Sequence, residues 1–483
     1  MMLVREAVAA EQAGQFALVE KLSTEILGLS PRNPGALAAR AGARVRLRKY
    51  ADARRDIEQA FATTNDPPAD WFATLAQIHR GAADLEAARE TLDRGLARHP
   101  GAEVLVSNMA EVLATLRRHD EAFALLDGAI TSGATRPGIL AQFGRACRNL
   151  KRPEASRPIL ERASRRDDLS PVGRQIILFE LGQTLDAMGD YAGAFDTIAR
   201  ANALETKPYD AQRHAEAVDQ TIAEWTRDRV RSAPKNAGAG ERSIFIVGMR
   251  RSGTTLVEQV LAAQGRVRAG DELGWLRELS TPLDPEGAKR FGLVRSPKGL
   301  TRPSVERIGR DYTRRVHDHA GSADRFTDKM PANWKLLGVA SLALPRARVV
   351  WVRRDPMDSC LSCYFHHFND NSYCAKLGDL ARYWHDCRRL LDHWRSVLDL
   401  QIHELVYERL VAEPEHEMHR LVEFLGLEWN EACLRFQEAG RTALTPSADQ
   451  VARPLYSSSI GRWKRYEAQI APLRSLLAEL GEA

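Results

Sequence analysis

Residues 244–256 read IFIVGMRRSGTTL, a phosphate-binding loop in which the usual lysine is missing. Gly248 and Gly253 stand at the G-x-x-x-x-G spacing of a Walker loop, and Thr255 occupies its Ser/Thr position. A nucleotide hydrolase places a lysine after the second glycine to reach the β- and γ-phosphates, but here that residue is Thr254. The stretch therefore predicts a strand, a loop and a helix that lack the side chain needed for nucleotide hydrolysis.

The loop keeps the features that hold an anion. Its backbone N–H groups and the positive end of the following helix attract negative charge, and Arg250 and Arg251 add two cationic side chains. Such a loop suits a phosphosulfate, which has no γ-phosphate and whose transfer needs no magnesium. On these residues alone, a generic anion loop of an α/β domain is an equal alternative.

The composition describes an ordinary globular chain of two or three domains. Its net charge of +5 is small for 483 residues and does not indicate a nucleic-acid binder. The first residues, MMLVREAVAAEQAGQ, carry charges throughout, so we expect no signal peptide. No apolar run approaches the roughly 18 to 20 residues of a membrane span. Six cysteines in so long a chain do not form a disulfide framework, which predicts a cytoplasmic protein. Because no membrane span is expected, we also expect no membrane partner.

Two cysteines, Cys360 and Cys363, form a C-x-x-C pair. Such a pair can be redox-active or supply half of a zinc site. The remaining cysteines provide no second C-x-x-C, and helical spacing places both thiols on one helix face. We therefore expect these two side chains to pack in the interior, and we predict no metal site.

The first half of the chain repeats itself with a period near 34 residues. Six segments align: GQFALVE, RKYADAR, ADLEAAR, RHDEAFA, KRPEASR and GDYAGAF. Their shared small positions, with spacings by subtraction of 34, 35, 34, 33 and 39, are Val19, Ala53, Ala88, Ala122, Ala155 and Ala194. Prolines that stop helices fall between the segments, at Pro31, Pro100, Pro137 and Pro171. The pattern resembles the tetratricopeptide repeat, whose helix pairs bury their apolar faces only against their neighbours.

We expect residues 1–205 to form this repeat array and residues 206–242 to form a capping helix and a linker. The helix should run from about Tyr209 to Val230, before the Gly/Ala/Pro-rich run SAPKNAGAGERS. Tetratricopeptide arrays usually offer a groove to a peptide or protein, so the array predicts such a partner. The alternative is an array that only stabilises or dimerises the protein.

Residues 243–483 form a second predicted domain, in which strands alternate with helices. The strand candidates are SIFIVG (243–248), RFTDK (325–329), RVVWVRR (348–354) and LQIHELVYE (400–408). This order predicts a central parallel sheet, so that the fold class is α + α/β, a helical solenoid followed by a P-loop-like domain. Ligands of such sheets bind at the carboxyl ends of the strands. Arg251, Lys329, Arg354 and Tyr407 all fall at those ends.

A second motif, RRDPMDSCLSCYFHHF, begins at Arg353 and leaves the third of these strands. It turns at Asp355 and Pro356 and enters a helix. Arg354 and Ser362 lie eight residues apart, so an arginine at a strand end and a hydroxyl two helical turns later can clamp one phosphate. The alternative is a helix start held by ion pairs.

Together the two motifs resemble those of sulfotransferases, over about residues 243–466. In that family the first loop holds the 5′-phosphosulfate of 3′-phosphoadenosine 5′-phosphosulfate (PAPS), and R-[ND]-P-x-[DE]-x-x-x-S holds its 3′-phosphate. The resemblance implies PAPS as the sulfonate donor and no metal. It also implies that Arg354, Ser362 and the loop bind the donor, the loop residues being Arg251, Ser252, Gly253, Thr254 and Thr255.

The sequence is most similar to the tyrosylprotein branch of the family. That branch has R-S-G-T-T-L, as residues 251–256 have here, and a G-E-E segment whose second glutamate is the proposed general base. Residues 270–272 read GDE and keep that glutamate as Glu272. Cytosolic small-molecule sulfotransferases carry a histidine base where this chain has Lys329, so the resemblance leaves Lys329 to neutralise charge on the transferring group. A helix cap or dipole partner is the alternative role for Glu272.

The C-terminal part continues the resemblance. Tyr407 matches a strand-end tyrosine beside the adenine ring, although an ordinary core tyrosine would fit the pattern equally. In the segment SADQVARPLYSSSIGRWKRYE, Ser447 matches a serine near the sulfonate. Arg462 stands where the family tends to have lysine near the 3′-phosphate.

The sequence therefore predicts an enzyme that transfers sulfonate from PAPS to an acceptor hydroxyl, foremost a tyrosine of a peptide or protein. The catalytic candidates are Glu272, Lys329, Arg251 and Ser447. Two alternatives stay open: a sulfotransferase for a carbohydrate or small molecule, and a repeat scaffold with a degenerate transferase domain. A homodimer is also left open, and no nucleic-acid partner is expected.

Overall fold

The computed structural model describes residues 2–47, 49–82, 84–368, 372–438, 455 and 457–482. It divides into two compact units, Met1–Thr197 and Ile198–Ala483, with the division inside the helix α12. We describe each unit by itself. In the described ranges, no helix combines the length and the apolar character needed to cross a membrane.

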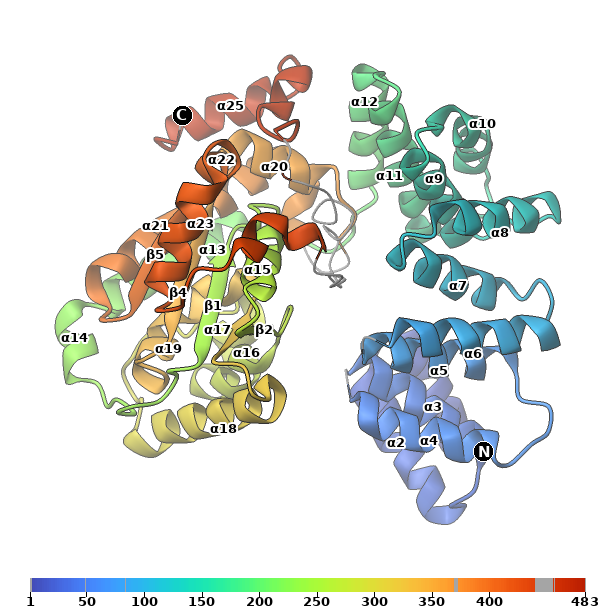
Figure 1. The fold of residues 1–483 in the computed structure, drawn as a ribbon, viewed down its shortest axis with the longest axis horizontal. Helices are drawn as coiled ribbons and strands as arrows, with labels where there is room; N and C mark the ends of the chain where they lie inside the picture. The colour runs from blue at the N-terminus through green and yellow to red at the C-terminus, as the bar shows by residue number, and fades with distance from the viewer. Residues whose placement is uncertain are drawn as a thin grey trace. The chain divides into compact units, whose positions relative to one another are not determined.

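The first unit is built from helical hairpins, drawn from blue to green in Figure 1. In each hairpin an odd-numbered helix is followed by an even-numbered one, as expected for a tetratricopeptide-like array. The helices are α1(Met2–Gln12), α2(Phe16–Leu29), α3(Pro34–Arg46), α4(Tyr50–Phe61), α5(Ala69–Gly81), α6(Leu85–Arg98), α7(Glu103–Thr115), α8(His119–Thr131), α9(Pro137–Asn149), α10(Pro153–Ser164), α11(Pro171–Ala187) and α12(Tyr191–Asn202).

The small residues of the repeat alignment occupy the buried crossing points of the hairpins, with one exception. Five of them are at most 2% exposed: Val19, Ala53, Ala88, Ala122 and Ala194. Ala155 is exposed, whereas its neighbour Ser156 is fully buried in α10. One residue turns a helix by about 100°, so this one-residue error exchanges the core face for the solvent face. With Ser156 aligned instead, the spacing from Ala122 is 34 by subtraction, which restores the period.

The second unit begins with a helix that packs on its long helix α21(Leu377–Val397). This is α13(Ala211–Glu224), which is followed by α14(Arg227–Ser232). His214 of α13 lies 2.8 Å from the carboxylate of Asp386 in α21, and both are buried. Burial lowers the pKa of His214 even with Asp386 beside it. The helical stretch expected at the end of the array thus lies in the second unit.

The core of the second unit is a five-stranded sheet in the order β2-β3-β1-β4-β5. Every strand pair is parallel, which confirms the predicted parallel sheet. The strands are β1(Ser243–Gly248), β2(Val267–Ala269), β3(Arg325–Asp328), β4(Arg348–Arg353) and β5(Gln401–Val406). The sequence patterns missed β2, because three residues are too few to show a periodicity.

Helices cover both faces of this sheet, as a parallel sheet requires. Ile244 and Ile246 of β1 belong to a buried cluster with Val257 of the following helix. Phe245, which points to the other face, contacts the ring of Tyr312 at a centroid distance of 5.6 Å. The remaining helices, with η for 3-10 helices, are α15(Thr254–Ala263), α16(Trp275–Ser280), η1(Thr281–Leu283), α17(Pro285–Arg290), α18(Arg302–Ala320), η2(Pro331–Leu336), α19(Leu337–Ala343), α20(Pro356–Tyr364), η3(Ser372–Ala375), α22(Tyr407–Ala412), α23(Pro414–Phe424), η4(Glu431–Glu438), η5(Arg462–Tyr466) and α25(Ala471–Glu479).

The strand order indicates which edge of the sheet should bind a ligand. β1 lies between β3 and β4, so the connections from β1 diverge to the two sides of the sheet. In open parallel sheets, ligands bind outside the carboxyl ends of the strands at this point of divergence. The lysine-less loop follows β1 directly and therefore occupies this position.

Candidate active site

The loop after β1 depends on two glycines in the left-handed region. Gly248 has φ +150° and Gly253 has φ +106°. A Cβ atom on Gly248 would lie 2.4 Å from the carbonyl oxygen of Val352, and one on Gly253 would lie 2.5 Å from the Tyr407 ring. Any larger residue would clash at both places, so the glycines let the loop fold closely against β4 and the end of β5.

The hydroxyl residues at the start of α15 are buried under this loop. Ser252, Thr254 and Thr255 are 1%, 4% and 6% exposed. The Ser252 hydroxyl oxygen is buried without a hydrogen-bond partner in the described part of the chain. Thr254, in the place of the Walker lysine, adds no charge, so the positive potential here comes from the N-terminus of α15 and from the loop's arginines.

The two sequence motifs meet at Arg251. Its Nε donates a hydrogen bond to the Ser362 hydroxyl at 3.0 Å, and its carbonyl oxygen accepts one from Arg354 Nη1 at 3.1 Å. Arg354 is only 9% exposed, and its Nε is buried without a partner among the described residues. The arginine and the serine of the second motif therefore converge on the lysine-less loop.

Tyr407 joins the same cluster from the end of β5. Its ring lies 4.8 Å from the Arg354 guanidinium, measured to the ring centroid, and its hydroxyl is 2.9 Å from the Ser459 hydroxyl. The tyrosine ring is thus buried against a cation on one side and the glycine loop on another.

Asp358 ties a C-terminal segment to this site. Its buried carboxylate accepts hydrogen bonds from the backbone N–H of Gly461 at 2.7 Å and of Trp463 at 3.1 Å. Arg354 Nη2 also donates to the carbonyl oxygen of Ser459 at 2.5 Å. Arg462 is thereby held beside α20, with its guanidinium 5.1 Å from the Phe365 ring centroid.

Ser447, the remaining candidate of this C-terminal stretch, lies outside the described residues. The structure therefore does not test its predicted position near the sulfonate.

Glu272 and Lys329 form an ion pair at the carboxyl end of β3. Lys329 is fully buried, and its Nζ lies 3.3 Å from Glu272 Oε1. The backbone N–H of Lys329 donates to the carbonyl oxygen of Asp271 at 3.0 Å, in a turn where Asp271 has φ +58°. The two predicted catalytic side chains are thus brought together.

Glu258 of α15 supports this turn, and sequence reasoning missed it. Its fully buried carboxylate accepts the Asp271 N–H at 3.1 Å and the Thr327 hydroxyl at 2.7 Å. A single acidic residue inside the apolar helix TTLVEQVLAA was the available signal. Glu258 therefore connects the phosphate loop's own helix to the segment that carries Glu272.

Arg250 is the other cationic side chain of the loop. Burial disfavours its charge, but nearby Tyr373 and Glu272 outweigh that effect, and the pKa of Arg250 is raised. Its guanidinium lies 5.2 Å from the Phe368 ring centroid. The loop therefore supplies two cations, Arg250 over the Phe368 ring and Arg251 bonded to Ser362.

The C-x-x-C pair lies in α20, where both residues are buried free thiols, as expected for packing residues. Burial raises the pKa of Cys360 well above its usual value, which disfavours a reactive thiolate. Cys363 Sγ donates to the carbonyl oxygen of Arg250 at 3.3 Å. Cys363 thus contacts the backbone of the phosphate loop.

The fold and the site define a P-loop-like α/β domain in which arginines from two loops meet at the carboxyl edge of the sheet. Comparison with known proteins shows which family this domain is similar to. Residues 243–431 match the model of the sulfotransferase family, so the second unit contains a sulfotransferase-family domain.

Two relatives extend the comparison. An uncharacterized protein of Aquifex aeolicus (strain VF5) is 30% identical over 314 residues, which are 62% of this chain and 41% of that protein. The protein-tyrosine sulfotransferase of Drosophila melanogaster is 26% identical over 259 residues, 48% of this chain and 51% of that protein. The chain thus spans about half, or less, of the length of these relatives. The resemblance to the tyrosylprotein branch is confirmed.

The helical array also has a structural neighbour. A thermophilic TPR protein from Thermus thermophilus shares 20% sequence identity, over 40% of this chain and 97% of that one, with a TM-score of 0.31. The repeat assignment itself rests on the 34-residue period and on the helical hairpins of the first unit.

The Asp358 contacts predict how the C-terminal segment is held. In Asp358→Asn, one of the two backbone N–H groups of Gly461 and Trp463 faces an amide NH₂ instead of an oxygen. Loss of one charge-assisted bond should raise the rate of trypsin cleavage within residues 462–465 about tenfold.

The matched control is Asp355→Asn in the same motif. Asp355 caps α20 by accepting the N–H of Asp358, and asparagine caps helices equally well. Its cleavage rate should stay near that of the wild type. Equal rates for both variants would show that Asp358 does not hold the segment.

Proposed function

We propose that this protein transfers sulfonate from PAPS to the hydroxyl of a tyrosine in a peptide or protein. The observation that carries the proposal is the convergence of the lysine-less loop, Arg354 and Ser362 on Arg251. A loop without the Walker lysine suits a donor without a γ-phosphate, and a second arginine site beside it suits an additional phosphate.

The residues of the site fit such a donor. Among the buried polar atoms that have no hydrogen-bond partner in the described part of the chain are Ser252 Oγ, Arg354 Nε and Ser359 Oγ. Buried polar groups are costly unless they are paired, so their concentration on the loop and on α20 favours a polar ligand there.

In this proposal each part of the donor has its own residues. The loop residues 251–255 and the N-terminus of α15 hold the 5′-phosphosulfate. Arg354, Ser362 and Arg462 hold the 3′-phosphate, and Tyr407 lies beside the adenine ring. The contacts of Arg251 with both Arg354 and Ser362 support this division, since one side chain borders both phosphate positions.

Glu272 is the proposed general base. The donor supplies a sulfonate group whose bond to the bridging phosphate oxygen breaks as the acceptor oxygen bonds to sulfur. Glu272 takes the acceptor proton, and Lys329, at 3.3 Å from Glu272, neutralises charge that develops on the transferring group. Arg251 and Ser447 complete the proposed charge stabilisation. A tyrosine is the favoured acceptor, because its pKa of about 10 is within reach of a carboxylate base.

The repeat array is the proposed docking surface for the acceptor peptide. A ladder of polar side chains crosses its helices α5, α7 and α9: Gln77 Nε2 donates to Asn108 Oδ1 at 3.1 Å, and Gln142 Nε2 donates to Ser107 Oγ at 3.0 Å. The Gln142 Oε1 atom is buried without a partner among the described residues. Half-buried amides in a row can pair with the backbone of an extended peptide.

The choice of donor gives the first test of this function. Adenosine 3′,5′-bisphosphate should bind in the presence of EDTA more tightly than ATP binds with magnesium. Arg354→Ala should weaken the bisphosphate about 10- to 100-fold, because a charge-assisted contact is lost. Adenosine 5′-phosphosulfate, which has no 3′-phosphate, should lose far less in the same calorimetric titration.

Arg353→Ala is the control for this experiment. Its guanidinium pairs with Glu404 at 2.7 Å and is 45% exposed, so it should leave both ligands unaffected. Tighter binding of magnesium ATP, or equal losses for both ligands in Arg354→Ala, would contradict the proposed donor.

The proposed base gives a second prediction. Glu272→Gln should bind adenosine 3′,5′-bisphosphate normally and lose about 10²- to 10⁴-fold in kcat, the usual cost of removing a general base. Asp271→Asn is the neighbouring control, because asparagine tolerates the left-handed backbone found there. Turnover of Glu272→Gln near the wild-type rate would show that another group takes the proton.

The ladder gives a third prediction. The combined variant Asn108→Ala and Gln142→Ala should raise the KM for a tyrosine peptide about 5- to 150-fold, since two hydrogen bonds of roughly 0.5 to 1.5 kcal/mol each are lost. A small phenol should keep its KM. Glu90→Ala and Asp127→Ala, exposed on α6 and α8, form the matched control. Equal effects on both acceptors, or none, would favour the small-molecule alternative.

A further inference from the structure

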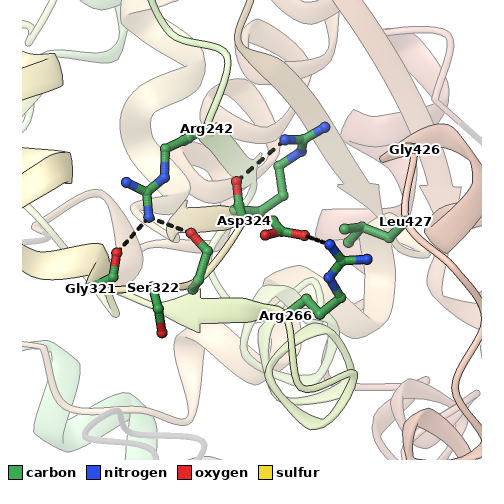
Figure 2. Close-up of a pocket in the computed structure, with 9 residues that line it drawn as sticks. Arg242, Arg266, Gly321, Ser322, Asp324, Gly426 and Leu427 are labelled. Atoms are coloured by element: carbon green, nitrogen blue, oxygen red, sulfur yellow. Dashed lines mark hydrogen bonds and ion pairs between the residues drawn. The ribbon is translucent and has the colours of Figure 1, made fainter.

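A polar pocket lies on the sulfotransferase-family domain, at the edge of the sheet opposite the proposed transfer site. It has a volume of about 440 Å³. Figure 2 shows its lining, which consists of Arg242, Arg266, Gly321, Ser322, Ala323, Asp324, Arg325, Gly426 and Leu427.

The arginines of this pocket come from the amino ends of three adjacent strands. Arg242 precedes β1, Arg266 precedes β2, and Arg325 begins β3. In a parallel sheet these ends share one edge, and the phosphate loop leaves β1 at the other. With six residues in β1 and about 3.3 Å per residue, the two sites are roughly 20 Å apart. The pocket is therefore separate from the transfer site.

The three guanidinium groups are fixed in place by local contacts. Arg242 Nη2 donates to the carbonyl oxygens of Gly321 and Ala323, and Arg266 Nη2 pairs with the Asp324 carboxylate at 2.5 Å (Figure 2). Arg325 Nη1 donates to the carbonyl oxygen of Asp324 at 3.3 Å. Each side chain is thus anchored through one terminal nitrogen, which holds it in the pocket before a ligand binds.

These contacts leave donors unused. In the part of the chain that the structure describes, the Nε of Arg242, Arg266 and Arg325 donates to no protein acceptor, and the Nε of Arg325 is also buried. A buried N–H without an acceptor is costly, so an acceptor ligand in the pocket would recover that cost.

The pocket also has an excess of positive charge. Three arginines line it against one carboxylate, that of Asp324. Arg348, at the start of the next strand, is close enough that burial and the charge of Arg325 together lower its pKa. Crowded cations of this kind repel one another, and an anion between them would relieve the repulsion.

We propose that this edge pocket binds a tetrahedral dianion, phosphate or sulfate, either as the free ion or as a monoester on a larger ligand. Three arginines against one aspartate leave two positive charges, which match the nearly two negative charges of such a group. Guanidinium forks suit its oxygens, and the Ser322 hydroxyl at the rim can add a further donor. The site is independent of the proposed sulfonate transfer.

Calorimetry on the full-length protein tests this site. Inorganic phosphate, and separately phosphoserine as a monoester, should bind at constant ionic strength more tightly than chloride does. If phosphate binds more tightly than phosphoserine, the free ion is the ligand form. If phosphoserine binds more tightly, the monoester is the ligand form. Either result supports the site. Binding of neither above the level of chloride overturns it.

Variants assign the binding to this pocket. Arg266→Gln, whose side chain is 53% exposed, should weaken the preferred anion at least about tenfold. Asp324→Asn should strengthen it severalfold, a gain that a folding defect does not produce. Arg346→Gln, which removes a nearby arginine paired with Glu241 outside the pocket, should have no effect.

The transfer-site variant Arg354→Ala separates the two sites. It should leave phosphate binding at the edge pocket unchanged, while Arg266→Gln should leave adenosine 3′,5′-bisphosphate binding unchanged. Loss of phosphate in Arg354→Ala but not in Arg266→Gln would place the ion in the transfer site and overturn the edge pocket. If the proposed donor is wrong, only the binding of adenosine 3′,5′-bisphosphate should depart from expectation, and phosphate binding at the edge pocket should not change.

Discussion

Arg354 is the side chain on which the architecture of the transfer site depends. It bonds to the carbonyl of Arg251 in the phosphate loop and to that of Ser459 in the C-terminal segment, and it lies over the ring of Tyr407. A guanidinium can do this because its five N–H donors point in fixed, divergent directions and its flat face packs on an aromatic ring. Three segments far apart in the chain are thereby joined at the carboxyl edge of one sheet.

The two edges of the sheet have different chemical characters. At the carboxyl edge lie the glycine loop, the Glu272–Lys329 ion pair and buried hydroxyls, which we propose as the transfer site. At the amino edge, arginines that start adjacent strands surround a pocket with a single carboxylate. Parallel strands produce both results, because residues at equivalent strand ends must lie side by side. The two proposed anion sites therefore lie at opposite edges of the sheet, without contact between them.

Several parts of the site could be read from the sequence, because they depend on residues close together in the chain. The glycine spacing of residues 248–253 defined the loop, and the apolar runs defined four of the five strands. The 34-residue period defined the array, although KRPEASR aligned one residue out of register, at Ala155 instead of Ser156. That error arose because both residues are small, and only packing distinguishes the buried one.

Sequence by itself thus determined the loops, helices and strand ends on which the proposed chemistry depends, because local spacing specifies them. Tertiary structure alone decided which side chains meet. The bond from Arg251 to Ser362, the hold of Asp358 on Gly461 and the support of Glu258 for the turn at Asp271 follow from the strand order. So does the arginine pocket at the amino edge, whose residues share no local motif. Contacts between residues distant in sequence are set by topology, and topology is an outcome of packing the whole core.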